Sequence, residues 1–132
     1  MSLNDEERAI VVRMQAEKAR KGIAEIPALQ ELGYYDTALN RLYYALYHAA
    51  SALLINDGIA VKTHLGINVQ LGQVYVAEGK LTPDEGHFYA RVQNLRERGD
   101  YNCSYNANAE LIEELLPRTE SLIEKMLSLA NV

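Results

Sequence analysis

Several residue types that often indicate a fold class or a function are rare or absent in this chain. Among 132 residues there is one cysteine, no tryptophan, one phenylalanine and three prolines. The single Cys103 cannot form a disulfide within the chain, so folding does not depend on an oxidising compartment. Long apolar runs are also missing, because the most apolar stretch, Tyr43 to Ile55, has thirteen residues and includes His48. A membrane span needs about twenty apolar residues, so we expect a buried helix there. The charged N-terminal segment MSLNDEERAI has no signal-peptide pattern, and together these features predict a cytoplasmic protein without a membrane partner.

The common cofactor motifs are absent too. There is no Gly-rich phosphate loop, no Cys-x-x-Cys, no His-Glu-x-x-His and no Asp-rich calcium loop. The Glu-x-x-His pairs of helical di-iron bundles are also missing. We therefore expect no cofactor and no bound metal. The net charge of −5 argues against tight binding to bulk nucleic acid, yet it leaves room for a local basic site. Two basic clusters stand out and are by default solvated helix faces: Arg13, Lys18, Arg20 and Lys21, and then Arg91, Arg96 and Arg98.

The sequence does contain the start and stop signals of several helices, as expected of a helical bundle. A capping-box pattern at Asn4–Glu7 precedes a helix expected to reach about Leu32, with Pro27 bending or breaking it. No stretch alternates with a period of two for long enough to be a strand. We expect one domain over residues 1–132, an all-α up-and-down bundle of four to five helices. The further helices are expected at about 34–56, 63–78, 83–98 and 109–129, with a loop from Asp100 to Asn108.

Arg41 and His48 are the first candidates for chemistry. Seven residues advance a helix by roughly 700°, so both side chains return to one face about 10 Å apart, with Tyr44 between them. Arginine is a permanent donor for phosphate, and histidine exchanges protons near neutral pH, a combination that suits phosphodiester cleavage. The competing interpretation is an arginine whose stem packs on the core and a histidine that is hydrogen-bonded inside it. On spacing alone, that structural interpretation is favoured.

The segment Leu95–Asn102, LRERGDYN, is the second candidate. It places Arg96, Asp100 and Tyr101 where a helix gives way to a loop, a pattern also expected of an ordinary helix C-terminus. We expect Asp100 to form an ion pair with Arg96 or with Arg41. His64 and His87 lie near predicted helix N-termini, where surface or capping roles are commoner than ligation.

Tyrosine is unusually frequent in one helix. Its run of Tyr34, Tyr35, Tyr43, Tyr44 and Tyr47 contrasts with the lack of tryptophan. Buried tyrosine adds apolar area and a hydroxyl that needs a partner, so packing against polar neighbours or a subunit interface is expected. Stacking on RNA bases is the less favoured alternative.

These residues carry a family resemblance. GYYDTALNRLYYALYHAASALL (33–54), followed by VKTH (61–64) and LRERGDYN (95–102), resembles the small standalone HEPN-domain proteins of bacteria and archaea. The resemblance runs from about Ala16 to Met126. It implies a compact helical bundle that works as a homodimer. Many HEPN proteins are metal-independent endoribonucleases whose signature is an arginine, four to six residues, and a histidine. Others pair with a separate minimal nucleotidyltransferase as toxin–antitoxin modules, in some cases with a tyrosine near the motif modified by adenylate.

The signature is met here only by Arg41 and His48. In ribonuclease members it usually lies near a later helix, where this chain has Arg96 to Tyr101 without a following histidine. The resemblance therefore implies catalytic roles for Arg41, His48 and Arg96 on RNA, in a polar cleft shared with Tyr44, His64, Asp100 and Tyr101. The alternative is a non-catalytic nucleotide-, RNA- or protein-binding module in which these residues form a structural polar network.

Overall fold

The computed structural model describes residues 3–132, so the first two residues of the N-terminal segment lie outside it. The fold is all-α, as predicted, and no strand occurs within residues 3–132. Counting α1 with α2 and α4 with η1 as interrupted helices gives five, at the upper end of the predicted number. The elements are α1 (Asp5–Ala24), α2 (Ile26–Leu32), α3 (Tyr35–Asn56), α4 (His64–Gln70), the π-helix η1 (Leu71–Val76), α5 (Pro83–Tyr101) and α6 (Ala109–Leu129).

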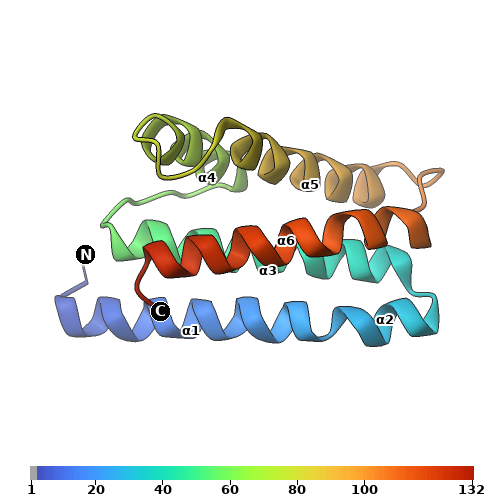
Figure 1. Ribbon diagram of the computed structural model, residues 1–132, viewed down its shortest axis with the longest axis horizontal. Coiled ribbons are helices and arrows are strands. Elements are labelled where there is room, and N and C mark those ends of the chain that lie inside the picture. The colour runs from blue at the N-terminus through green and yellow to red at the C-terminus, as the bar shows by residue number, and fades with distance from the viewer. Residues whose placement is uncertain (1–2) are drawn as a thin grey trace.

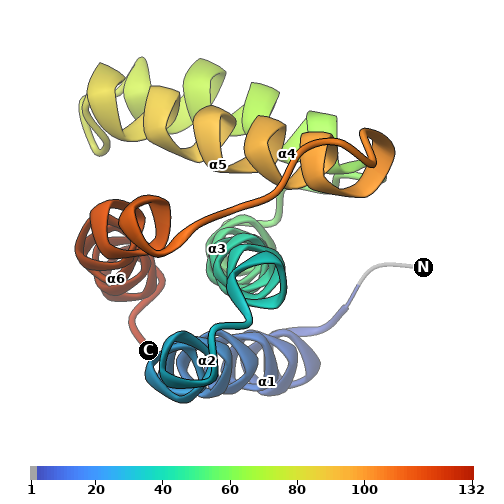
Figure 2. The same cartoon turned by 90° about the vertical axis from the view of Figure 1, so that its right-hand side faces the viewer.

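Helix α3 forms the centre of the molecule. Seen end-on, it lies between α1 on one side and the α4–α5 pair on the other, with α6 beside it (Figures 1 and 2). It packs against α1, α2, α4, α5 and α6. Twelve of its residues are buried, which matches its apolar sequence and leaves polar side chains such as His48 to find partners within the protein. Among residues 3–132, no helix is long and apolar enough to cross a membrane.

Helix boundaries follow the capping signals of the sequence. The side chain of Asn4 accepts a hydrogen bond from the Glu7 amide at 2.8 Å, and Thr82 caps α5 in the same way through the amide of Glu85 at 3.1 Å. Gly33 ends α2 with φ of 76°, a left-handed conformation that glycine adopts without steric cost. These local signals decide where the chain turns, and so they set the helix lengths.

The predicted break at Pro27 occurs and falls at Glu25, since proline cannot donate to the carbonyl four residues earlier. Two other boundaries differ from the sequence prediction. The helix expected over 63–78 becomes α4 followed by the π-helix η1, in a segment that Gly66 and Gly72 make a poor α-helix former. Helix α5 continues past Gly99 to Tyr101. The loop predicted from Asp100 therefore starts later, because Asp100 bonds back to Arg96 one turn earlier.

Candidate functional site

Arg41, Tyr44 and His48 line one pocket on the α1-facing side of α3. The pocket has a volume of about 250 Å³ and is completed from the α1 side by Lys18, Lys21, Gly22 and Glu25. The helices come close here because small residues face each other: a Cβ added to Gly22 would lie 3.5 Å from the Cβ of Ala45. The close approach brings the side chains of both helices to one pocket.

His48 is held in a defined protonation state by a neighbour on α1. Its Nδ1 lies 2.7 Å from the amide oxygen of Gln15. An amide oxygen only accepts, so Nδ1 carries the proton and donates it, and Nε2 of the neutral ring is left as the base. Burial lowers the pKa of His48, and the charges of Lys18 and Arg41 lower it further. At neutral pH the ring is therefore uncharged and able to accept a proton.

The same pocket gathers positive charge. Lys18, Lys21 and Arg41 line it, and within residues 3–132 none of the three has a carboxylate oxygen within 4.0 Å. Arg41 is exposed and donates from Nη2 to the side-chain oxygen of Asn40 at 3.2 Å. Glu25 is the one acidic residue of the lining. With three basic side chains against one acidic one, the pocket suits an anion such as a phosphodiester.

Arg96 belongs to a second group of polar residues, on the α5 side of α3. Its guanidinium carbon lies 4.7 Å from the ring centre of Tyr43 and 5.4 Å from that of Tyr44. Its Nη1 donates to Asp100 at 2.6 Å, while its Nε is buried and has no hydrogen-bond partner in the described part of the chain. Burial lowers the pKa of Arg96, but the bond to Asp100 and the nearby tyrosines outweigh this and raise it overall. The guanidinium is thus fixed in place by an ion pair and two aromatic rings.

His64 joins the tyrosines rather than serving as a surface residue at a helix start. Its ring is stacked on Tyr47, with centres 4.7 Å apart and planes at 12°, and its Nδ1 is hydrogen-bonded to the hydroxyl of Tyr43. Burial raises the pKa of Tyr43 to about 12, so this hydroxyl keeps its proton at neutral pH. His64 is therefore part of the aromatic cluster, whereas His87 is exposed on α5.

Comparison with known proteins gives the family. The sequence of residues 12–129, nearly the whole chain, matches the family model of the HEPN domain. The chain belongs to the HEPN family. It is similar to a UPF0332 protein of Thermotoga maritima, with 26% identity over 122 residues that cover 92% of this chain and 91% of the relative. A UPF0332 protein of Archaeoglobus fulgidus is 28% identical over 120 residues, 91% of this chain and 95% of the relative. A protein of Methanocaldococcus jannaschii named "Putative toxin MJ0605" is 28% identical over 110 residues, 83% and 81% of the two chains.

In this HEPN domain the candidate residues form two groups that meet at Tyr44. Arg41 and His48 share the pocket toward α1, while the carboxylate of Asp100 pairs with Arg96 and not with Arg41. Tyr44 lines the first pocket and also lies under Arg96. Tyr101 is 86% exposed at the end of α5. The expected single cleft is thus described better as two neighbouring sites on opposite sides of one tyrosine.

Sequence reasoning overlooked Gln15, the residue that fixes the tautomer of His48. It also left Lys18 and Lys21 as part of a solvated face, although they line the pocket of Arg41. A signal was available, since Gln15, Lys18 and Gly22 lie at intervals of three and four and so share one face of α1. What that face contacts, however, is set by packing between helices far apart in sequence.

Proposed function

We propose that this HEPN protein is the toxin-like component of a two-component module and cleaves RNA without a metal ion at the Arg41–His48 pocket. The observation that carries the proposal is the bond between Gln15 and His48, beside three basic side chains that form no ion pair within residues 3–132. It supplies both requirements of phosphodiester cleavage, a base for the nucleophile and positive charge for the transition state. Arg41 and His48 also meet the arginine-and-histidine spacing of the family signature, although on an earlier helix than in most ribonuclease members.

The reaction follows from the free nitrogen of His48. Nε2 accepts the proton of a ribose 2′-hydroxyl, and the 2′-oxygen attacks the adjacent phosphorus in line. The bond from phosphorus to the 5′-oxygen breaks, and that oxygen takes a proton from water. Arg41, with Lys18 and Lys21 beside it, stabilises the charge of the phosphorane. The products are a 2′,3′-cyclic phosphate and a 5′-hydroxyl, and no metal or other cofactor takes part.

The proposed partners follow the family. We propose a homodimer in the cytoplasm and a separate minimal nucleotidyltransferase that restrains the toxin. Two relatives carry the word toxin in their names, which supports a module of this kind. The exposed Tyr101 next to the Arg96–Asp100 pair is the tyrosine best placed to accept an adenylate from such a partner.

The decisive experiment is cleavage of single-stranded RNA in the presence of a metal chelator. The wild type is expected to give products with a 2′,3′-cyclic phosphate, whereas His48→Ala and Arg41→Ala remain folded and lose at least a hundredfold in rate. His87→Ala, which alters an exposed histidine of α5, is the matched control and keeps full activity. Cleavage that is unchanged in His48→Ala, or absent in the wild type both alone and as a complex with its partner, refutes the proposal.

A second function, that of a binding module without catalysis, has support of its own. Arg96 contacts Asp100 and Tyr43, and Tyr43 is hydrogen-bonded to His64, so these residues are connected within the protein as in a structural network. On this alternative, Arg41→Ala and His48→Ala leave every biological effect intact, while variants of Arg96 lose it together with stability. Growth of cells that produce each variant with and without the partner separates the two functions.

A further inference from the structure

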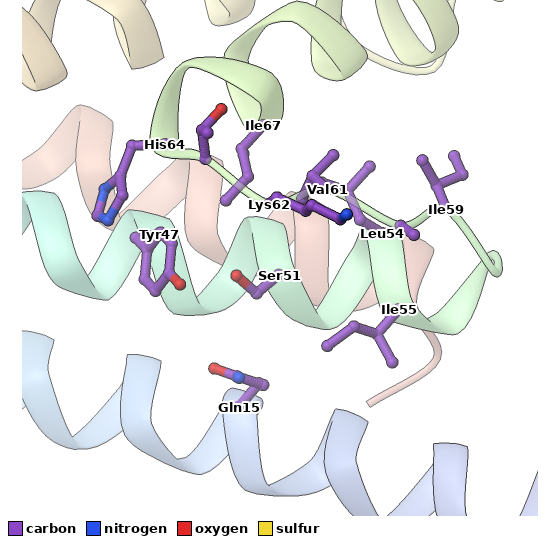
Figure 3. A pocket seen from close by; sticks show the side chains of 12 residues that line it. Gln15, Tyr47, Ser51, Leu54, Ile55, Ile59, Val61, Lys62, His64 and Ile67 are labelled. Atoms are coloured by element: carbon purple, nitrogen blue, oxygen red, sulfur yellow. The ribbon is translucent and has the colours of Figure 1, made fainter. Parts of the chain in front are cut away.

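A second pocket lies farther along α3, between α3 and the start of α4, next to the α1–α3 groove that holds the His48 pocket. Its volume is about 290 Å³, and it is closed on one side by the segment 59–63 that leads from α3 to α4 (Figure 3). The floor is apolar and made by side chains of α3, α4 and that segment. The apolar lining residues are Leu54, Ile55, Ile59, Ala60, Val61 and Ile67.

Polar and aromatic groups are gathered at one end of this pocket. Tyr47 and His64, the stacked pair described above, form its aromatic end, and the hydroxyl of Ser51 and the amide of Gln15 face the same space (Figure 3). Lys62 lies along the rim, exposed to solvent. The pocket thus offers aromatic and aliphatic walls, a hydroxyl, an amide and one positive charge. This is the set of groups that recognises a heterocyclic base attached to a phosphate.

Gln15 links the two pockets, because it lines the second and is hydrogen-bonded to His48 of the first. Its oxygen accepts from His48, which lines the first pocket, while the residue itself lines the second. Its amide nitrogen has no hydrogen-bond partner within residues 3–132. A group that accepts a hydrogen bond in the second pocket would engage this nitrogen and hold the oxygen toward His48. The two pockets extend along α3 from Arg41 to Ile55, about 20 Å, which is room for a few nucleotides.

We propose that the second pocket binds one base of the RNA whose phosphate lies at His48, so that it sets the sequence preference of cleavage. The inference rests on the proposed function for the position of the phosphate. Gln15 then acts as a positioning residue: its amide nitrogen reads the base and its oxygen keeps the Nδ1 proton of His48 in place. Lys62 contacts the phosphate that follows the bound base.

Binding of RNA that cannot be cleaved tests the base site without depending on activity. Titration with 2′-O-methyl homotetramers of A, C, G and U is the measurement, since methylation removes the nucleophile. Wild-type protein is expected to prefer one base at least fivefold over the weakest. Ser51→Ile, which fills the pocket from α3, abolishes the preference, and Ser128→Ile on the exposed face of α6 is the matched control. Lys62→Ala, an exposed change that leaves the core intact, weakens binding of all four tetramers severalfold, and Lys80→Ala does not.

The outcomes separate this inference from the proposed function. A base preference that survives Ser51→Ile, or equal binding of all four tetramers by the wild type, overturns the base site even if RNA is cleaved. A base preference lost in Ser51→Ile, in a protein that cleaves no RNA, supports the base site and refutes catalysis. Should Ser51→Ile fail to fold, the Lys62→Ala comparison decides, because unchanged binding there overturns the proposal.

Discussion

His48 owes its proposed role to its neighbours. The oxygen of Gln15 fixes the proton on Nδ1, and burial together with Lys18 and Arg41 lowers the pKa below the ordinary 6.5. A group whose pKa is lower in the folded than in the unfolded state binds fewer protons when folded. Between the folded and the unfolded pKa of His48, the free energy of unfolding therefore rises with pH. It decreases again as the pH falls below 6.5, because the unfolded chain then binds a proton more readily than the folded protein.

This sign gives the first prediction. Urea unfolding at pH 5.0 and at pH 7.5 is expected to show a smaller stability difference in His48→Gln than in the wild type, because glutamine does not titrate. The exposed His87→Gln serves as control and keeps the wild-type difference. An unchanged difference in His48→Gln would mean that the folded protein does not disfavour the charged ring.

Gln15→Glu provides the second prediction. A carboxylate in place of the amide still accepts from Nδ1 of His48 but stabilises the imidazolium, so it raises the pKa of that ring. The acidic limb of the pH–rate profile for RNA cleavage is expected to move to higher pH than in the wild type. Met14→Ala, on the exposed side of the same turn of α1, is the control. A profile that stays in place in Gln15→Glu would contradict the role given to Gln15.

Arg96 supports the third prediction. Lysine keeps the charge but neither stacks on Tyr43 and Tyr44 nor holds Asp100 with a planar fork. Arg96→Lys is expected to lower the free energy of unfolding by about 2 kcal/mol. Arg98→Lys, an exposed change in the same turn, should alter it by less than about 0.5 kcal/mol. Chemical denaturation of both variants is the measurement, and equal midpoints would show that the cluster contributes no stability.

At the scale of elements, two glycines differ in whether their backbone conformation requires glycine. Gly22 is helical in α1, and an added Cβ would make an ordinary contact with Ala45, so glycine there is not required by space. Gly33 has φ of 76°, and nothing lies within 4 Å of its Cβ position, so its backbone conformation alone requires glycine.

The fourth prediction follows from this contrast. Gly22→Ala is expected to raise the free energy of unfolding by about 0.5–1 kcal/mol, because alanine favours the helix. Gly33→Ala is expected to lower it by about 1 kcal/mol, since the left-handed conformation strains any Cβ. Thermal or urea unfolding measures both changes. The same sign for the two variants would show that packing, and not backbone conformation, dominates at one of these sites.

For the whole molecule, the net charge of −5 and the basic pocket act against each other. A negative net charge disfavours non-specific binding of nucleic acid, so on the proposed function the affinity for RNA depends on the few cations gathered between α1 and α3. Three of them, Lys18, Lys21 and Arg41, line the His48 pocket. The proposed function therefore implies fewer phosphate contacts than basic RNA-binding proteins make.

Salt dependence provides the fifth prediction. With three phosphate contacts to single-stranded RNA, a plot of log affinity against log salt concentration is expected to have a slope of about −2. Lys18→Ala should reduce the steepness by about 0.7. Lys125→Ala is a control outside the groove, since Lys125 pairs with Glu85 between α6 and α5. A slope near zero would place RNA binding elsewhere or exclude it.

The sequence by itself determined the helices and the family. The helix boundaries follow from local signals, namely the caps at Asn4 and Thr82 and the stop at Gly33. These signals can be predicted because they depend on residues only a few positions apart. The apolar stripe of α3 is likewise a pattern within one helix. The sequence also placed Arg41 and His48 on one helix face, a matter of helical geometry. The end of α5 was missed because Asp100 bonds back to Arg96, and the π-helix η1 because no simple spacing rule predicts it.

Only the tertiary structure decided which residues meet. Asp100 was open to Arg41 or Arg96 and pairs with Arg96. His64, 16 residues beyond His48 in the chain, packs into the tyrosine cluster, and Gln15 comes from another helix to bond His48. The physical reason is that these contacts depend on how α1, α4 and α5 dock against α3. Burial of apolar area drives that docking, and it does not depend on which polar side chains are brought together.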